Sequence, residues 1–343
     1  MSDKGNTINQ HAVAKLAGVS HATVSLVFSG HPRISEPTRK KVLEAAKKLN
    51  YVPDRNFAAR KLAFYRLGKK LKSKIIGIPW ALSGGWSHQE SFHRTIFDSV
   101  VKACWDSDRM LVMIDMNCAE ETIKSKLVHL DGLVIPTAML KFITAAKELN
   151  LPTVSIFGGY EQIIDVRADD AQMTHTIVNF LYEKGYRKLA YVGPYIESIF
   201  AFKRWEGFLK GVREHVLTMD PRWAVHDYSL WDYEKQGYES FKMLWNLDNL
   251  PEAVVFYNDK MALGALQAAR ELGVNIPGKV AIVGIDGIPE GQSSNPPLTT
   301  YKLDLENAGQ IALEALDMID TPGDVVGMTR YLTGSMIAGG TTR

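Results

Sequence analysis

Residues 13–28, with the sequence V-A-K-L-A-G-V-S-H-A-T-V-S-L-V-F, constrain the fold of this chain more than any other stretch. Gly18 separates two short apolar stripes of helical period and can take a positive φ at little cost, so the pattern predicts a helix, a tight turn and a second helix. Ala14 is small enough for the helices to approach closely, and the Ser20 hydroxyl can accept from unpaired N–H groups of the second helix. The apolar stripes consist of Val13, Ala17, Val19, Val24 and Val27.

The second predicted helix leaves His21, Ala22, Ser25 and Leu26 on its outward face. In a helix-turn-helix, this face enters the major groove of DNA with its first residues against the base edges. Any small helical hairpin could show the same apolar pattern. The surrounding sequence therefore has to distinguish the two interpretations.

A third helix is predicted at 35–49, with Ser35 as its N-cap and Pro37 in its first turn. Three helices are enough for a minimal core. The expected buried stripe of this helix is Val42, Leu43, Ala46 and Leu49.

Charge is distributed unevenly along the chain. Residues 1–74 carry 16 Lys and Arg against 4 Asp and Glu, a balance of +12, whereas the remaining residues carry 24 against 34, a balance of −10. A basic segment is typical of a part that binds a polyanion. A merely solvated basic surface is the alternative, but the clustering of these charges around a helix-turn-helix favours DNA binding.

From residue 74 onward, short apolar runs alternate with amphipathic stretches such as 93–105 and 140–150. This alternation predicts α/β architecture with parallel sheets covered by helices on both faces. Two similar sets of strands imply two lobes, and ligands of such folds bind beyond the carboxyl ends of the strands, here in a cleft between the lobes. The runs begin at Ile75, Met110, Gly132 and Thr153 in the first set, and at Lys188, Ala224, Ala253 and Val280 in the second.

The motifs V-A-K-L-A-G-V-S-x-A-T-V-S at 13–25 and N-Y-x-P at 50–53 resemble the lactose-repressor (LacI/GalR) family of transcriptional regulators, and the resemblance continues along nearly the whole chain. It implies a small all-α headpiece at 1–53, a hinge helix and basic linker at 54–74, and a periplasmic-binding-protein-like core at 75–343. We expect lobe one at 75–165 and 293–325 and lobe two at 166–292 and 326–343. The helix at 303–319 would return to lobe one, and a final strand around Tyr331 would lie in lobe two. The chain would cross between lobes at Asp165, near Pro289 and near Thr329.

Two departures from the family concern DNA recognition. Thr7 and Ile8 lie two residues further out than the corresponding family pair, and Leu26 stands where the family often has an arginine that reads a base. The operator therefore cannot be copied from relatives.

The family's hinge helix folds upon operator binding and wedges a leucine into the minor groove. Asn56 and the A-R-K-L stretch at 59–62 resemble this hinge, although Leu62 lies nine residues after Pro53, where the family commonly has seven. A plain flexible linker is the alternative. The expected DNA-binding residues are Ser20, His21, Ala22, Thr23, Ser25, Leu26, Arg33, Asn56, Arg60 and Leu62.

Polar residues near the expected strand ends resemble the family's effector-binding residues. Asn258 ends the F-Y-N-D run, Asp286 ends V-G-I-D, and Arg204 in K-R-W-E-G-F matches the family's cleft arginine. A planar guanidinium suits a polyol or a carboxylate because its donors have a fixed geometry. Surface or capping roles are the alternative, and Asp259 is expected to be the N-cap of the helix that follows it. Gly287 replaces a second family aspartate, so one expected polar contact or hinge bond is missing.

Aromatic residues add a second indication, because flat rings stack against sugar faces or bases. Trp80 and Trp86 flank the loop A-L-S-G-G, and the S-G-G-W-S stretch at 83–87 is interpreted as a cleft loop. These rings could equally pack against the opposite lobe or a dimer partner. The expected ligand-binding residues are Trp80, Ser83, Trp86, Phe92, Arg204, Trp231, Asn258 and Asp286.

Several classes of protein are disfavoured. His88 and His93 are five residues apart, which fails the i, i+4 spacing of a helical zinc site, and the sequence has no G-x-S-x-G elbow, Walker loop or dinucleotide fingerprint. We therefore expect no enzymatic activity, no cofactor and no metal. Cys104 and Cys118 lack zinc-type spacing and are expected to be core thiols in a reducing cytoplasm. The polar N-terminus and the absence of an apolar run of membrane-spanning length predict a cytoplasmic protein without membrane contact.

The sequence thus predicts a homodimeric transcription regulator, a repressor, that binds double-stranded operator DNA and is controlled by a small polar effector, expected to be a sugar. Dimerisation follows from operator geometry, because half-sites ~34–36 Å apart require a twofold protein and a pseudo-palindromic site. A purine- or nucleoside-responsive co-repressor protein is one alternative. A solute-binding protein of a transporter is another, which the basic headpiece and the missing signal segment disfavour.

Overall fold

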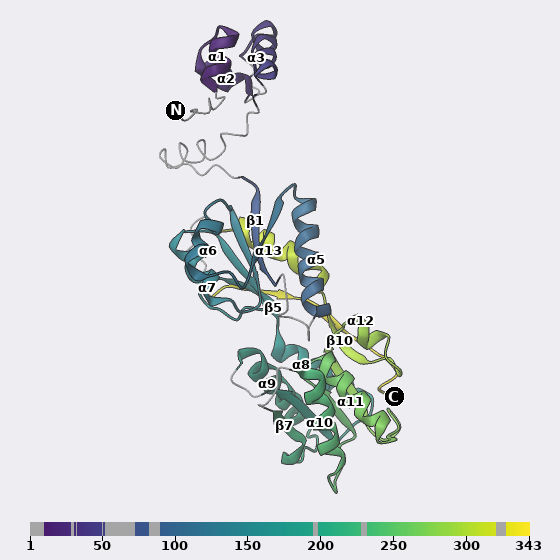
Figure 1. The fold of residues 1–343 in the computed structure, drawn as a ribbon. Helices are drawn as coiled ribbons and strands as arrows, with labels where there is room; N and C mark the ends of the chain where they lie inside the picture. The colour runs from purple at the N-terminus through teal and green to yellow at the C-terminus, as the bar shows by residue number, and fades with distance from the viewer. Residues whose placement is uncertain are drawn as a thin grey trace, which may run out of the picture. The chain divides into compact units, whose positions relative to one another are not determined.

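The chain divides into two compact units, residues 1–72 and 73–343 (Figure 1). The computed structural model describes residues 10–28, 31, 33–49, 51, 73–81, 90–194, 198–227, 232–319 and 327–343. The predicted hinge helix therefore lies outside the described residues. So do six expected site residues, namely Asn56, Arg60, Leu62, Ser83, Trp86 and Trp231.

The described part of the headpiece contains three helices around one small core, as predicted: α1 (Gln10–Ala17), α2 (His21–Phe28) and α3 (Glu36–Lys48). Gly18 has a φ of 65°, and the Val19 N–H donates to the Ala14 carbonyl oxygen over 3.1 Å, which closes the turn between α1 and α2. The core consists of Val13, Ala14, Val24, Val27, Val42, Ala45, Ala46 and Tyr51.

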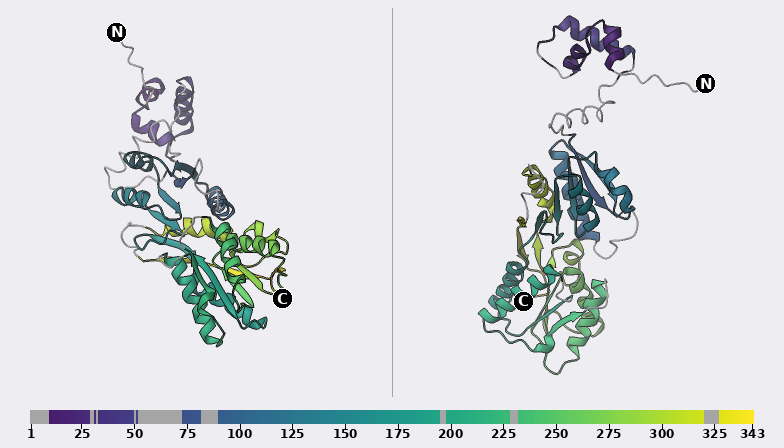
Figure 2. Two further views of the ribbon diagram at one scale, coloured as in Figure 1. Left: turned by 60° about the horizontal axis from the view of Figure 1, so that its bottom comes forward. Right: turned by 90° about the vertical axis from the view of Figure 1, so that its left-hand side faces the viewer.

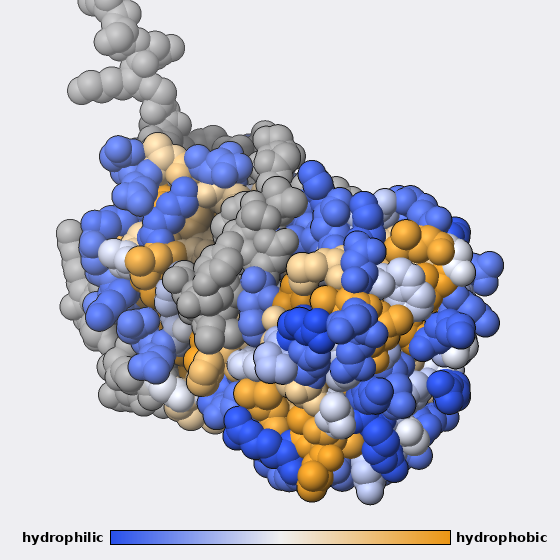
Figure 3. Space-filling model, turned by 90° about the horizontal axis from the view of Figure 1, so that it is seen from below, coloured by the Kyte–Doolittle hydropathy of each residue, from blue (hydrophilic) through white to orange (hydrophobic). Residues whose placement is uncertain are grey.

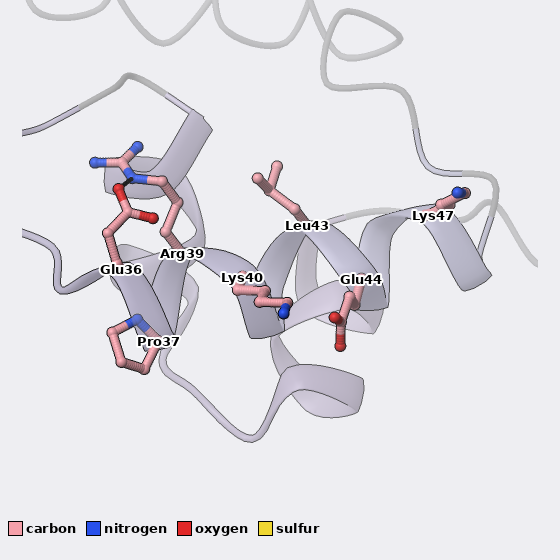
Figure 4. Close-up of a pocket in the computed structure, with 7 residues that line it drawn as sticks. All are labelled: Glu36, Pro37, Arg39, Lys40, Leu43, Glu44 and Lys47. Atoms are coloured by element: carbon pink, nitrogen blue, oxygen red, sulfur yellow. Dashed lines mark ion pairs between the residues drawn. The ribbon is translucent and has the colours of Figure 1, made fainter.

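Two details of α3 differ from the prediction. Leu43 was expected in the buried stripe but is 48% exposed, because Val42 faces the core together with Ala45 and Ala46 at helical spacing and turns Leu43 outward. Ser35 occupies the N-cap position, but its side chain makes no cap hydrogen bond. Leu43 instead lines an open surface hollow along α3 (Figure 4), together with Glu36, Pro37, Arg39, Lys40, Glu44 and Lys47.

In its described residues, the second unit contains two six-stranded sheets with the same strand order. The first sheet is parallel and has the order β11-β5-β4-β3-β1-β2. Its strands are β1 (Ile75–Trp80), β2 (Met110–Asp115), β3 (Gly132–Pro136), β4 (Thr153–Ile156), β5 (Ile164–Ala168) and β11 (Thr329–Leu332).

The second sheet has the order β12-β10-β9-β8-β6-β7 and is parallel except for β12, which runs antiparallel to β10. Its strands are β6 (Leu189–Pro194), β7 (Ala224–Asp227), β8 (Ala253–Phe256), β9 (Ala281–Asp286), β10 (Thr299–Leu303) and β12 (Gly334–Ile337). The predicted α/β architecture of two lobes is confirmed.

Pairs of helices cover both faces of each sheet (Figures 1 and 2). On the first sheet, α5 (Glu90–Asp106) packs with α13 (Ala308–Asp317), and α6 (Glu120–Leu127) with α7 (Leu140–Glu148). On the second sheet, α8 (Asp170–Glu183) packs with α9 (Ile199–Glu214), and α10 (Tyr233–Trp245) with α11 (Asp259–Glu271). Shorter helices are α12 (Pro289–Gln292), η2 (Pro221–Trp223) and η3 (Leu305–Asn307). On the face drawn in Figure 3, apolar groups (orange) lie between polar ones (blue).

The predicted lobe boundaries are wrong near the C-terminal end. Tyr331 lies in β11, which pairs with β5 of the first sheet, whereas the sequence placed this strand in lobe two. Strand β10 belongs to the second sheet although 293–325 was assigned to lobe one, so the chain crosses after β10 and not near Pro289. Both strands are polar in composition, T-T-Y-K-L and T-R-Y-L, so apolar runs give no signal for them. The resemblance placed a strand around Tyr331 correctly but assigned it to the wrong lobe.

Helices α10 and α11 approach each other through two glycines. A Cβ on Gly264 would lie 1.8 Å from the Glu234 carbonyl oxygen, and one on Gly237 would lie 1.9 Å from the Met261 carbonyl oxygen. In both cases the obstacle is backbone, which cannot move aside as a flexible side chain could. The close packing of these helices therefore requires glycine, which has no Cβ, at both positions.

We predict that Gly264→Ala lowers the free energy of unfolding by about 2–3 kcal/mol, because the added methyl group separates the two helices. Urea denaturation of the full chain measures this effect. Gln267→Ala, at an exposed position of the same helix, is the control and should change stability little. Equal stability of the Gly264 variant and the control would contradict the packing described.

Candidate DNA-binding surface and effector site

Ser20 stabilises the start of α2. The Thr23 N–H donates to the Ser20 Oγ over 3.1 Å, and the hydroxyl groups of Ser20 and Thr23 are 2.8 Å apart. A side-chain oxygen that accepts from the first turn satisfies one of the N–H groups left unpaired at a helix N-terminus. The predicted capping role of Ser20 is confirmed.

The outward face of α2 has the composition expected from the sequence. His21, Ala22, Ser25 and Leu26 are exposed, Leu26 by 38%, whereas Val24 and Val27 are buried. Arg33 is exposed beyond the end of α2. Direct contact of these residues with DNA remains a prediction.

A further residue on this surface was not predicted. The ring of His11 in α1 stacks on that of His21, with centroids 4.4 Å apart and an angle of 23° between the planes. This contact restricts the orientation of the first residue of α2. Sequence periodicity gives no signal for it, because the two histidines lie on different helices across the turn.

In the first lobe, the two expected ligand-binding residues that are described make aromatic contacts. Trp80, the last residue of β1, packs against Phe97 with centroids 4.5 Å apart. The ring centroid of Phe92 lies 5.3 Å from that of Phe157, and the Phe157 centroid lies 6.3 Å from that of Phe200 in α9. Phe92 is therefore part of a row of rings that joins α5 of the first lobe to α9 of the second, as the packing alternative allowed.

In the second lobe, Arg204 is buried in a network of charged groups. Its Nε donates to Asp170 Oδ1 over 2.7 Å, its Nη1 donates to the Tyr257 carbonyl oxygen, and its guanidinium lies 4.3 Å from the centroid of the Tyr257 ring. Burial alone would lower the pKa of Arg204, but Tyr257, Asp170 and Asp286 raise it, so the group stays charged. Asp170 and Tyr257 were not predicted as site residues.

Asp286 lies at the end of β9, near Arg204. It is partly accessible, and desolvation by the surrounding protein raises the pKa of its carboxyl well above the usual range, although Arg204 opposes this shift. Its φ of 118° is unusual for a residue with a side chain, and such backbone strain is commonly found at functional sites. Asp286 thus combines strain, charge and partial exposure at the carboxyl edge of the sheet.

The N-cap of α11 is Asn258 and not, as expected, Asp259. Asn258 is the N-cap of α11, since its Oδ1 accepts from the Met261 N–H over 2.9 Å. Asp259, expected as the N-cap, is fully buried one residue later and accepts from the N–H groups of Gly287 and Ile288 at 2.8 Å each. It also accepts from the Thr300 hydroxyl at 2.6 Å and therefore fixes the loop after β9. The ligand-binding role expected for Asn258 stays a prediction.

The remaining expectations concern thiols, metals and membranes. Cys104 is buried, and burial raises the pKa of its thiol to about 11, whereas Cys118 is only partly buried. Among the described residues, no cluster of acidic, histidine and cysteine side chains could hold a metal ion. Within the same residues, no helix has the length and apolar character needed to cross a bilayer.

Comparison with known proteins agrees with this architecture. Residues 11–54 match the model of the lacI family of bacterial regulatory proteins, and residues 178–342 match a periplasmic binding protein-like domain. The chain is 30% identical to the probable HTH-type transcriptional repressor ExuR of Bacillus subtilis over 324 residues, which cover 90% of this chain and 91% of that protein. It is 30% identical to the HTH-type transcriptional repressor PurR of Proteus mirabilis over 318 residues, with coverage of 89% and 88%.

The fold is similar to the crystal structure of the lac repressor dimer bound to operator and the anti-inducer ONPF. The TM-score is 0.72 at 24% identity, with 98% of this chain and 99% of that chain covered. The chain therefore belongs to the LacI family of bacterial regulatory proteins and is a DNA-binding transcriptional repressor.

The buried carboxyl of Asp259 makes stability depend on pH. Burial raises its pKa from 3.8 to about 7, so between these values the folded protein holds a proton that the unfolded chain releases. The free energy of unfolding contributed by this group therefore falls as pH rises through this window. We predict that Asp259→Asn makes the fall shallower, measured by urea denaturation between about pH 4 and about pH 8. Identical slopes in both proteins would contradict the assignment.

Proposed function

We propose that this repressor binds a pseudo-palindromic operator as a homodimer in the cytoplasm, and that a small polar ligand, a sugar, bound between the two lobes controls its affinity for DNA. The proposal that the protein binds DNA rests on the exposed surface of α2. Ser20 caps this helix, and the side chains of His21, Ala22, Ser25 and Leu26 are exposed on its surface. A major groove admits one such helix, whose first residues then lie against the base edges.

The homodimer is supported by an apolar surface on the first lobe, which we call the β2 patch. It combines β2, the last strand of the first sheet among the described residues, with the end of α5, and consists of Val101, Trp105, Met110, Val112 and Met113. Trp105 is 84% and Met110 64% exposed. An edge strand with apolar side chains is prone to pair with another chain, and a second copy would remove this surface from water.

The effector part of the proposal is supported by the charged network of the second lobe. Arg204 and Asp286 lie where parallel sheets bind ligands, at the carboxyl edge of β9 and beside the residue that follows β8. A guanidinium donates and a carboxylate accepts, which together suit the hydroxyl groups of a sugar. The row of rings from Phe92 to Phe200 supplies apolar surface between the lobes.

The first test concerns base recognition. Leucine has no donor, so Leu26 can contact a thymine methyl group but cannot read guanine O6 and N7 as arginine does. We predict that Leu26→Arg shifts preference toward a G·C pair at one symmetric position per half-site, by about 1–3 kcal/mol. Selection from randomised DNA with both proteins in parallel measures this shift. Identical preferred sites would show that Leu26 does not face the bases.

The second test concerns assembly. Met110→Lys places a charge in the β2 patch, and burial of that charge in a dimer would be unfavourable. We predict that the variant sediments as a monomer at concentrations at which the wild-type chain is a dimer, and that it loses affinity for a two-half-site operator. Met243→Lys, at an exposed position on α10, is the control. A dimeric Met110 variant would exclude this patch as the interface.

The third test concerns the effector. We predict that Asp286→Ala weakens binding of the sugar that stabilises the wild-type chain by at least about 10-fold, because a buried charged hydrogen bond is lost. Calorimetric titration with D-glucose, D-galactose, D-ribose, hypoxanthine and guanine identifies the ligand and separates the sugar from the purine alternative. Asp248→Ala, at an exposed ion pair, is the control. Unchanged affinity of the Asp286 variant would remove this residue from the site.

A further inference from the structure

His21 is the first residue of α2, and its side chain is exposed on the headpiece surface. Among the described residues, no hydrogen bond fixes its imidazole ring. The ring of His31 differs, since its Nδ1 accepts from the Arg33 N–H over 3.2 Å. The nitrogen atoms of His21 are therefore available to another molecule, and the orientation of the ring depends on its other contacts.

His11 of α1 provides such a contact. Its ring stacks on that of His21, with centroids 4.4 Å apart and an angle of 23° between the planes, a geometry that aromatic rings favour. His11 is exposed as well, and neither ring belongs to the headpiece core. Because an exposed pair contributes little to the stability of the fold, its main physical effect is to restrict the rotation of the two side chains.

The backbone beneath both rings is held by the turn between α1 and α2. In that turn, the Val19 N–H donates to the Ala14 carbonyl oxygen over 3.1 Å. At the start of α2, the Ser20 hydroxyl accepts from the Thr23 N–H over 3.1 Å. With the two helix backbones fixed in this way, side-chain rotation is the freedom that remains to the first residue of α2, and the stack restricts it.

The stack covers a face of the His21 ring and leaves its edge, with Nδ1 and Nε2, for recognition. In a neutral imidazole one nitrogen donates and the other accepts. Each base pair presents its own pattern of donors and acceptors in the major groove. A ring held in one orientation matches one such pattern, whereas a rotating ring can match several and has to be ordered when it binds. Restriction of the ring therefore increases discrimination between bases.

We propose that His11 is a positioning residue for base recognition: its ring holds His21 in the orientation in which the imidazole edge contacts a base, without reading a base itself. This inference rests on the proposed docking of α2 in the major groove. It extends the set of residues that determine operator specificity from α2 to α1.

The test compares affinities of the full chain for the operator selected from randomised DNA and for versions of it with one base pair changed symmetrically in both half-sites. Fluorescence anisotropy gives the Kd values. His21→Ala identifies the base pair that His21 reads, because discrimination between the four bases falls there. His11→Ala should reduce discrimination at the same pair about 2–10-fold, the factor expected for the loss of one stacked pair, and leave the other pairs unchanged.

Two further variants separate stacking from other roles. His11→Phe keeps an aromatic ring and should retain the discrimination of the wild-type chain. In a His21→Ala background, His11→Ala should cause no further loss at that base pair, because the ring that it positions is absent. Glu44→Ala, at an exposed position of α3, is the control and should leave discrimination unchanged at every pair.

Four results would overturn the proposal. Unchanged discrimination in His11→Ala, together with a loss in His21→Ala, would remove the positioning role and leave the docking of α2 intact. A loss at a different base pair, or an equal loss in His11→Phe and His11→Ala, would show that the His11 nitrogen atoms contact DNA themselves. An equal loss of affinity for every site would show a merely structural role. Unchanged discrimination in His21→Ala at every pair would remove the proposed docking of α2 as well.

Discussion

Each lobe holds the loop after its fourth core strand with one buried carboxylate. Asp259 accepts from the N–H groups of Gly287 and Ile288, and in the first lobe Asp165 accepts from those of Gly158 and Gly159 at 2.9 and 3.1 Å. Each carboxyl group also accepts a hydrogen bond from a hydroxyl group of a neighbouring strand: Asp259 from Thr300, and Asp165 from Ser155. These bonds hold Asp286 and Phe157 at positive φ, so the positions of the proposed effector-binding side chains depend on two carboxylates that do not themselves face the ligand.

The second lobe places three carboxyl groups around one guanidinium. Burial raises the pKa of Asp170, Asp259 and Asp286, and the positive charge of Arg204 opposes this shift at all three carboxyl groups. A ligand that donates a hydrogen bond to Asp286, the partly accessible member of this group, would stabilise its charged state, which the ligand-free protein disfavours. The protonation and the stability of such a site depend on whether a ligand is bound. A regulatory site needs this dependence, because a ligand shifts a conformational equilibrium only when its affinity for the two conformations differs.

Features set by local sequence were predictable. The turn at Gly18, the cap at Ser20 and the exposure of His21 and Leu26 follow from spacing within one helical hairpin, and the structure has them as expected. The apolar strands were equally visible because burial on both faces requires continuous apolar runs.

Features set by tertiary contacts were not predictable. Strand β10, and the sheet to which the expected strand at Tyr331 belongs, are determined by pairing with β9 and β5, which local sequence does not indicate. Asn258 and Asp259 are both good capping residues, and only the position of the loop at Gly287 decides which one caps α11. The Arg204–Asp170 pair joins α9 to α8 across 34 residues. Resemblance identified the arginine, but not the carboxylate that holds it.

We propose that effector binding at the second lobe's charged network and operator binding at the headpiece's DNA-binding surface are thermodynamically coupled. The most direct measurement is the affinity of the full chain for its selected operator with and without saturating effector, together with the affinity for effector with and without operator. Coupling requires the two ratios to be equal, and we expect each to be about 5–150-fold. Effector binding that leaves operator affinity unchanged would contradict the account.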